Sequence, residues 1–540
     1  MTKQILIKAA AGGIFLCVLA GSVYADEPAQ AAAETTQKMG EAAAQPAENS
    51  FDVFEYRVTG NTVLAVGLIE EAVYPWLGEK KTIADVDKAR EALENAYHKA
   101  GYLTVLVDIP EQDVNQGVVA LNVTEGKIDH LRVQGSHYYS LGRIKAQLPA
   151  LTEGGVPYFP DVQKQMGNVN RTADKRVTPV LRAGKKFGTV DVDLKVEDSL
   201  PLHASIELND KYSNLTERWR LMGMVRYDNL FQRDHSLTLQ FQTTPQDTSQ
   251  VQVFSASYLY RFDDSDTMLS FYAVKSKSNV ATIGGIGVLG NGTILGARVI
   301  KPLPSLDNYY HNFSFGFDYK DFQQDIKFGS DTSSLPISYV PMAAQYSGTY
   351  QDDNSVNQLA LGMSFGLRGL KGDDTEFNAK RAGAKANFFT FKPELQRTQT
   401  LPVGIQLWAK VDGQFSGSPL ISNEQYAAGG VDSVRGYLEV ETLGDRAIHS
   451  SLEVRSPILR SGDWLDELRL IGFYDIASVN IIDPTPQEQG HRVIAGTGFG
   501  IKAKAFKNWN AAMYLARALQ SGEITSSGDI SGHMRFWYEF

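Results

Sequence analysis

The stretch 358–367, Gln-Leu-Ala-Leu-Gly-Met-Ser-Phe-Gly-Leu, decides the fold of the C-terminal part of this chain. Large apolar side chains stand at every second position, and small or polar residues fill the positions between them. A period of two is that of a β-strand whose two faces meet different surroundings. The stretch therefore predicts a strand with one apolar face and one face of small or polar residues.

The same alternation recurs from about Leu202 to Phe540, notably in 237–241, 313–319 and 403–411, with Asp, Asn, Gly, Ser and Pro between the runs. A soluble β-sandwich also alternates. A transmembrane barrel turns the apolar face to lipid and the polar face to a wet lumen. The polar faces here are mostly Gly, Ser, Gln and Asp, and roughly 340 residues are too many for one sandwich of about 100. We predict an antiparallel transmembrane barrel over 200–540, and at about 20 residues per strand it has about 16 strands.

The first 25 residues have the features of a secretory signal peptide. Lys3 and Lys8 precede an apolar run from Ala9 to Ala20, and the small-residue cleavage rule fits the residues up to Ala25. The single cysteine, Cys17, lies inside this segment, so the predicted mature chain has no disulfide. Residues 26–50, rich in Ala, Glu, Gln and Pro, are predicted to form a linker or a short helix.

Residues 51–199 are predicted to be two copies of one small α/β unit, 51–126 and 127–199. In the first copy, strands at 54–58, 103–109 and 119–123 flank a helix around 86–97. In the second, strands at 128–133 and 187–196 flank a helical region at 140–176. Glycines recur at similar offsets in the two copies, at 60 and 135 and at 117 and 188. Fixed spacing of this kind indicates a tandem duplication.

Composition and motifs exclude several kinds of site. A formal net charge of −10 is not that of a nucleic-acid-binding protein. The nine histidines have no metal-ligand spacing, so no metal or cofactor is predicted. The string 362–366 matches a nucleophile elbow and 285–290 a dinucleotide fingerprint, but neither has the strand–turn–helix context that such chemistry needs. The glycines of 496–500 are interpreted as one face of a strand, and no catalytic residue is predicted.

Two motifs in the C-terminal part carry a family resemblance. The first is Gly-Gly-Val-Asp-Ser-Val-Arg-Gly-Tyr at 429–437, and the second is Phe-Tyr-Asp-Ile-Ala at 473–477, with 444–445 and 452–457 between them. Together with the signal peptide and the paired α/β units, these motifs resemble the TpsB transporters of two-partner secretion, relatives of the barrel-assembly insertases. In that family the small units are POTRA domains, the barrel has sixteen strands, and the first motif lies on a loop folded into the lumen. Ala477 is a departure, because the family has glycine there.

The resemblance implies a set of site residues. A guanidinium presents two parallel donors that match a carboxylate, so Arg435 of the loop could pair with Asp475 of the barrel wall. Spacing alone favours a solvated turn residue at Arg435 and an ordinary lumen-facing charge at Asp475, whereas the surrounding motif favours the pair. The expected site comprises the loop residues Gly429, Gly430, Val434, Arg435, Gly436 and Tyr437, the wall residues Phe473 and Asp475, and a C-terminal assembly signal at Phe536, Tyr538 and Phe540.

The implied function is protein export, not enzymatic catalysis. The family's POTRA domains bind unfolded cargo in the periplasm, by addition of a strand to a free sheet edge, and the barrel carries the cargo across the outer membrane. Expected partners are a large secreted TpsA-like protein, outer-membrane lipids and the barrel-assembly machinery. Three alternatives stay open: a general barrel-assembly insertase, a lipase-type barrel enzyme and a secreted β-sandwich adhesin.

Overall fold

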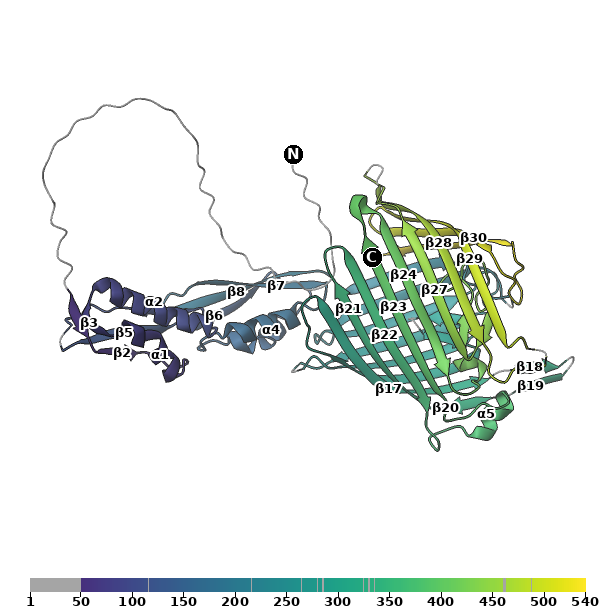
Figure 1. Ribbon diagram of the computed structural model, residues 1–540, viewed down its shortest axis with the longest axis horizontal. Coiled ribbons are helices and arrows are strands. Elements are labelled where there is room, and N and C mark those ends of the chain that lie inside the picture. Colours follow the sequence, from purple (N-terminus) through teal and green to yellow (C-terminus); the bar gives the residue numbers. More distant parts are fainter. Residues whose placement is uncertain are drawn as a thin grey trace, which may run out of the picture. The chain divides into compact units, whose positions relative to one another are not determined.

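The computed structural model describes residues 50–540, except 115, 215, 264, 279, 284–285, 324, 329–330, 335, 460–462 and 487. The predicted signal peptide, and the predicted linker up to residue 49, lie outside the described residues. The chain divides into two compact units, Met1–Leu200 and Pro201–Phe540 (Figure 1). None of the helices in the described part is both long and apolar enough to cross a membrane.

The first α/β domain packs helices on a sheet of order β2-β5-β4, in which β2 and β5 are parallel. The helix α2 buries Val86, Ala89, Leu93 and Tyr97, a stripe at helical spacing. Thr82 and Asp85 form its capping box, and hydrogen bonds from the Thr82 backbone N–H and hydroxyl hold the pKa of Asp85 below its usual value. The elements are β1 (Phe51–Val53), β2 (Glu55–Thr59), α1 (Val66–Val73), η1 (Tyr74–Trp76), β3 (Gly78–Lys81), α2 (Ile83–Lys99), β4 (Val105–Asp108) and β5 (Val118–Glu125).

The second domain has the equivalent order β6-β8-β7, again with a parallel central pair. The predicted helical region 140–176 is wrong in part, because it is two helices separated by a loop, and its last residues begin strand β7. Pro149 and Pro157, which lack a backbone N–H, lie in the interruption. The elements are β6 (Lys127–Gln134), α3 (Leu141–Ala146), η2 (Pro149–Leu151), α4 (Phe159–Val169), β7 (Lys175–Ala183) and β8 (Thr189–Asp198).

Equivalent glycines make the same backbone contact in the two domains. Gly60 and Gly135 have φ values of 86° and 85°, in the left-handed region. A Cβ on Gly60 would lie 2.1 Å from the carbonyl oxygen of Val123, and a Cβ on Gly135 would lie 2.5 Å from that of Val196. The recurring glycines of the sequence therefore occupy one site of a repeated fold.

In each domain, a carboxylate at the end of the middle strand of the sheet, β5 or β8, holds the turn that follows β2 or β6. Glu125 accepts a hydrogen bond from the Val63 N–H at 3.0 Å, and Asp198 accepts one from the Tyr138 N–H at 2.8 Å. Burial opposes ionisation of Asp198, but bonds from the Tyr138 and His137 N–H groups outweigh it and hold the pKa of Asp198 below its usual value. The Asp198 carboxylate is therefore charged at neutral pH.

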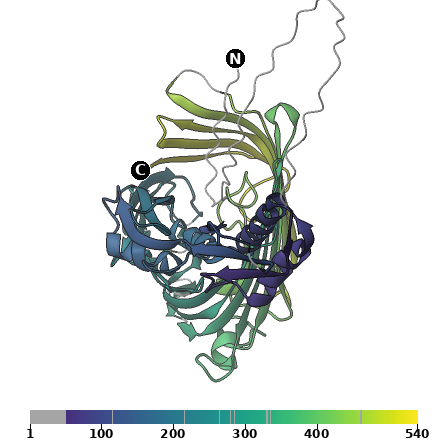
Figure 2. The ribbon, with the colours of Figure 1, turned by 90° about the vertical axis from the view of Figure 1, so that its left-hand side faces the viewer.

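The C-terminal unit is a closed antiparallel barrel, which confirms the predicted fold class (Figures 1 and 2). Within the described residues it has 16 strands, counting β20 and β21 as one because both pair with β17. They are β9 (Leu202–Asn209), β10 (Arg220–Leu230), β11 (His235–Thr243), β12 (Gln252–Arg261), β13 (Met268–Lys277), β16 (Asn291–Pro302), β17 (Tyr309–Gln323), β20 (Ile337–Tyr339), β21 (Pro341–Gln351), β22 (Ser355–Gly366), β23 (Phe389–Thr400), β24 (Gln406–Ser416), β27 (Arg446–Arg455), β28 (Leu465–Asn480), β29 (His491–Ala505), β30 (Trp509–Ala518) and β31 (Ile530–Glu539).

The ring closes where β31 pairs with β9, and we call this junction the seam. Its ladder joins 535–539 to 205–209 over five residue pairs, the shortest ladder of the ring in the described residues. The ladder between β28 and β29 has fifteen pairs.

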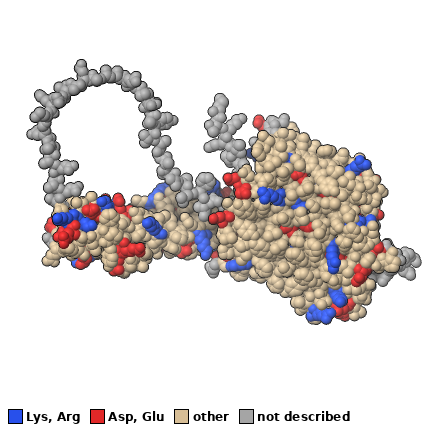
Figure 3. Space-filling model, viewed as in Figure 1, with Lys and Arg blue, Asp and Glu red and all other residues tan. Residues whose placement is uncertain are grey.

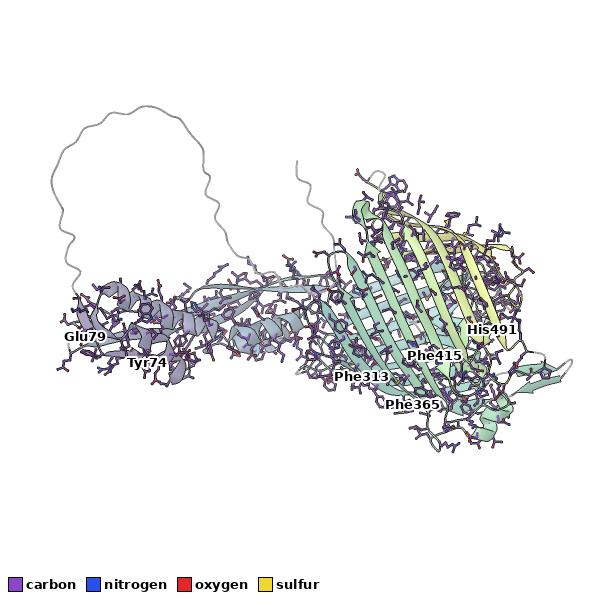
Figure 4. The ribbon with its side chains drawn as sticks, in the orientation of Figure 1. Tyr74, Glu79, Phe313, Phe365, Phe415 and His491 are labelled. Atoms are coloured by element: carbon purple, nitrogen blue, oxygen red, sulfur yellow. The ribbon has the colours of Figure 1, made fainter. Side chains whose placement is uncertain are left out.

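The apolar faces of the strands point outward. Phe313, Phe315 and Phe317 of β17 are 43%, 40% and 48% exposed, whereas Asp318 of the same strand is buried. Figure 4 labels Phe313 and Phe415 on the barrel strands, and the middle of the barrel surface in Figure 3 is almost free of charge. A soluble sandwich would bury this apolar face, so the direction of the side chains selects the membrane-barrel interpretation.

The structure corrects the predicted start of one strand and places Ser364 inside another. The run 403–411 was expected to be one strand, but β24 begins at Gln406, and Pro402–Gly404 form a turn with Val403 at φ 64°. Alternation continues by chance through this turn, so the prediction is wrong at its start. Ser364 lies inside β22, in register with Thr390 and Ala343, and not on the sharp turn of a nucleophile elbow.

Long and short connections alternate around the barrel. Connections such as 231–234, 352–354 and 506–508 are short and lie at the end where β9 begins and β31 ends. The opposite end carries long connections, among them 367–388 with α5 (Asp374–Lys380) and 417–445 with η4 (Ser422–Glu424), β25 (Tyr426–Ala428) and β26 (Thr442–Gly444). Two further hairpins at this end are β14 (Val280–Ile283) with β15 (Ile286–Leu289), and β18 (Asp325–Phe328) with β19 (Asp331–Ser334).

Candidate functional site: the lumen loop

The connection 417–445 folds into the barrel, and we call its tip, 429–441, the lumen loop. The strands β25 and β26 pair at its base. Gly429 and Gly430 turn the chain there with φ values of 109° and 95°. A Cβ on Gly430 would lie 2.2 Å from the carboxyl carbon of Glu439, and one on Gly429 would lie 2.5 Å from the Cβ of Glu441. Both positions therefore require glycine for conformation and for space.

Arg435 of the loop binds the barrel wall through its whole guanidinium group. Its Nε and Nη2 donate to the two carboxylate oxygens of Asp475 at 2.7 and 2.8 Å, and its backbone N–H donates to Asp475 Oδ2 at 3.1 Å. Its Nη1 donates to Glu453 Oε1 at 2.6 Å. The Ser451 hydroxyl donates to Asp475 Oδ1 at 2.6 Å. The structure thus brings Arg435 and Asp475 together, with two partners that the sequence did not single out.

Both members of this ion pair are buried. Arg435 is 4% exposed and Asp475 is fully buried. The guanidinium carbon lies 3.7 Å from the ring centroid of Phe473 and 5.0 Å from that of Tyr514. The interpretation of Arg435 as a solvated turn residue is therefore wrong. Loss of one partner would leave a buried charge uncompensated, which costs about 3–5 kcal/mol.

The next two residues tie the loop to β29, to β31 and to the connection that follows β30. Gly436, at φ 101°, donates its N–H to Nε2 of His533 on β31 at 3.1 Å. The Tyr437 hydroxyl lies 2.9 Å from the Ala495 carbonyl oxygen and 2.7 Å from that of Gln520. The two residues that follow Arg435 therefore also hold the loop in place.

Val434 is fully buried in a cluster that includes Tyr437, Ile494 and Ala477. Ala477 is the residue at which this chain departs from the family's glycine. Its methyl group is fully buried among these side chains, so the packing accommodates the departure.

Two residues that contact the lumen loop were not predicted from the sequence. His449 of β27 contacts Asp412 Oδ1 through Nδ1 at 2.7 Å and the Ser433 carbonyl oxygen through Nε2 at 3.0 Å. Gly496 lies against the loop, because a Cβ there would be 1.9 Å from the carbonyl oxygen of Arg435. The sequence analysis interpreted Gly496 only as part of a glycine-lined strand face. For Glu453, the motif 452–457 was the only signal in the sequence.

The aromatic residues of the expected assembly signal lie at the seam. Phe536 pairs with Leu208 and Tyr538 with Ile206, both on β9. The backbone of Phe540 exchanges hydrogen bonds with that of Ala204, at 3.1 and 3.2 Å. These residues form part of the ring closure. Their recognition by the barrel-assembly machinery stays a prediction.

One group of side chains in the N-terminal unit has atoms of the types that bind metals, namely Asp129, His130 and Asp191. Cations already face both carboxylates: Lys186 lies 3.5 Å from Asp129, and Arg132 lies 3.4 Å from Asp191. These carboxylates are thus engaged in ion pairs, and the expectation that no metal is bound stays a prediction.

Solved structures of outer-membrane proteins share this fold. CdiB from Escherichia coli matches with a TM-score of 0.65 at 17% sequence identity, covering 93% of each chain. BamA from Haemophilus ducreyi lacking POTRA domains 1–3 matches with a TM-score of 0.54 at 13% identity, covering 91% of this chain and 100% of that chain. At these identities the likeness shows the fold alone.

Sequence comparison reaches further. The heme/hemopexin transporter protein HuxB of Haemophilus influenzae is 20% identical over 370 residues, which are 67% of this chain and 64% of HuxB. The chain thus spans just under two thirds of that relative. A model of the ShlB-type POTRA domain matches residues 51–126, and a model described as haemolysin secretion/activation protein ShlB/FhaC/HecB matches 188–503, more than half of the chain. The chain belongs to the haemolysin secretion/activation protein family ShlB/FhaC/HecB.

Proposed function

We propose that this protein exports one large secreted TpsA-like partner protein across the outer membrane by two-partner secretion, and that it is not an enzyme. The observation that carries the proposal is the lumen loop, which a buried Arg435–Asp475 pair holds inside a sixteen-stranded barrel of this family. Unfolded cargo binds the α/β domains, enters the barrel and folds outside. Lipids of the outer membrane and the barrel-assembly machinery are its other proposed partners.

The location follows from the family. The barrel lies in the outer membrane, and the N-terminal α/β domains are periplasmic. The end of the barrel that carries the short connections, where β9 begins, is accordingly the periplasmic end, and the long connections lie at the cell surface.

A general insertase is the second candidate, because BamA shares the fold. The fold therefore does not separate the two functions, and the match to a secretion family over 188–503 favours the dedicated exporter.

The proposed entry point for cargo is the outer edge of β4 in the first domain. In the described residues, β2 and β4 are the outer strands of its three-stranded sheet, and β6 and β7 those of the second. Pro179 lies within β7 and has no N–H to donate, and the exposed Glu55 and Arg57 form an ion pair on β2. Proline and charge discourage strand addition. The strand β4, Val-Leu-Val-Asp, carries the exposed Leu106. Its Val105 carbonyl oxygen and Val107 N–H are bonded by the side chains of His98 and Glu94 of α2, so an extended cargo segment that adds to β4 must replace these two bonds.

Deletion of the gene tests the export function. We expect one large protein to disappear from the medium and to accumulate in the periplasm, while other outer-membrane barrels keep their normal levels. The measurement is quantitative proteomics of medium, periplasm and outer membrane, with plasmid complementation as control. A general fall in outer-membrane barrels would identify an insertase instead, and an unchanged secreted fraction would reject export.

Leu106→Lys tests the entry point. Leu106 is 57% exposed, so the domain should fold normally, but a lysine on the edge disfavours strand addition. We expect at least a fivefold fall in the initial rate of export, measured by pulse–chase. Leu68→Lys is the matched control, because Leu68 is also an exposed leucine of this domain but lies on α1. Equal rates for the two variants would move the entry point away from β4.

A further inference from the structure

The connection 367–388 at the surface end of the barrel is a folded element. Its helix α5 is capped by Asp373, which accepts a hydrogen bond from the Glu376 N–H at 2.8 Å. Asp374 accepts another from the Ala386 N–H at 2.9 Å, which ties the helix to the returning chain. Phe377 of α5 is 1% exposed. This connection therefore has a definite shape and a buried face of its own.

That buried face packs against the barrel wall and against the base of the lumen loop. The ring of Phe377 lies 5.3 Å from that of Tyr339 on β20, in an edge-on arrangement, and Phe388 lies 6.3 Å from Tyr339. Leu420 and Ile421, which precede the lumen loop, are buried in the same cluster. The element 367–388 thus contacts the chain that enters the lumen as well as the wall.

A second contact joins the same partners through charge. Arg381, just after α5, donates from Nη2 to Asp445 Oδ2 at 2.8 Å, and its Nη1 bonds the other carboxylate oxygen. Arg381 also donates to the carbonyl oxygens of Leu420 and Ile482, at 2.6 and 3.0 Å. Asp445 is fully buried and accepts from the N–H groups of Leu420 and Ile482, at 2.9 and 2.7 Å. Three surface connections, 367–388, 417–445 and 481–490, therefore meet at one carboxylate.

We propose that 367–388 is a lid over the surface end of the lumen and that the Arg381–Asp445 pair is its latch. The lid closes the resting barrel to ions and must swing away before a polypeptide can emerge. The latch suits this task because a buried bidentate pair holds firmly when complete and fails when one partner is removed. The requirement for cargo rests on the proposed export function, whereas closure to ions does not.

Single-channel conductance in planar bilayers tests the latch without cargo. We expect Arg381→Ala to raise the open probability at least threefold over the unaltered protein. Arg368→Ala is the matched control, because Arg368 lies in the same connection but is largely exposed, and its ion pair is with the exposed Asp374. An Arg381→Ala barrel that is folded, by its heat-modifiable mobility, and conducts like the control would overturn the latch.

A reversible tether tests whether the lid must move, and it leaves the latch intact should Arg381→Ala fail to fold. A Cβ on Gly383 would lie 4.0 Å from the Cβ of Pro419, within the range that a disulfide spans. The only natural cysteine, Cys17, lies in the predicted signal peptide, so Gly383→Cys with Pro419→Cys forms a defined pair. We expect oxidation to lower export at least tenfold and reduction to restore it, with both single-cysteine variants unaffected by redox state.

The two readouts separate the failure of one proposal from the failure of the other. Equal export by the oxidised and reduced tethered protein would overturn the lid. Without any export in the unaltered protein, the export function fails. Conductance alone then tests the lid. The disulfide of the tethered variant should keep the conductance at the closed level until reductant is added.

Discussion

Arg435→Ala is expected to lower export of the partner protein at least tenfold while the barrel remains folded and at its normal level. The substitution leaves Asp475 and Glu453 buried without their cation, and breaking such a pair costs about 3–5 kcal/mol. A loss of this size is enough to turn a loop that is nearly always docked into one that is often released. The strands keep their ladders, because Arg435 belongs to none of them. Export per folded barrel, together with hydrogen exchange of 429–441, measures both effects.

Arg435→Lys is the control for charge. It keeps a cation near Asp475 but loses the fork of parallel donors, so export is expected to fall between the alanine variant and the unaltered protein. Normal export by Arg435→Ala, with faster exchange in the loop, would show that docking of the loop is not needed for secretion.

Gly496→Ala is expected to have an effect nearly as large, through space alone. The added Cβ would lie 1.9 Å from the carbonyl oxygen of Arg435, so either the loop tip or strand β29 must shift. The loop is the part that can move, because β29 is hydrogen-bonded on both sides. We expect the guanidinium to leave Asp475 and export to fall at least fivefold. Crosslinking between an engineered loop position and the wall measures the displacement.

Gly472→Ala is the matched control for this variant. Gly472 lies on the neighbouring strand β28, and a Cβ there would meet nothing within 4 Å. It should assemble and export like the unaltered protein. If Gly472→Ala were as defective as Gly496→Ala, loss of a strand glycine would explain the effect, and the contact with Arg435 would not.

The architecture was predictable because its signals are local. A period of two identifies a strand wherever one face differs from the other, as in β17 and β22, and repeated glycine spacing identifies the duplicated domains. The same period cannot tell which face is outside, and the exposure of Phe313 and its neighbours settled that question. The start of β24 was wrong because Val403 continues the alternation inside a turn.

The site was predictable only where a motif resemblance supplied the missing geometry. Arg435 and Asp475 are 40 residues apart, and their contact depends on how far the loop descends into the lumen and on the register of β27 with β28. No local pattern encodes either quantity. His449 and Gly496 were missed for the same reason, because their role follows from what lies opposite them in three dimensions.

The seam has a mechanical consequence. In a closed barrel, a force that widens the ring acts on every pair of neighbouring strands. Each ladder bears the same total circumferential force, whatever its number of residue pairs. With five residue pairs, the ladder between β9 and β31 is the shortest in the described ring and has a third as many pairs as the ladder between β28 and β29. A polypeptide that stretches the wall as it passes would therefore separate β31 from β9 first, beside Phe536 and Tyr538. Aromatic side chains and lipid would then cover the exposed strand edges.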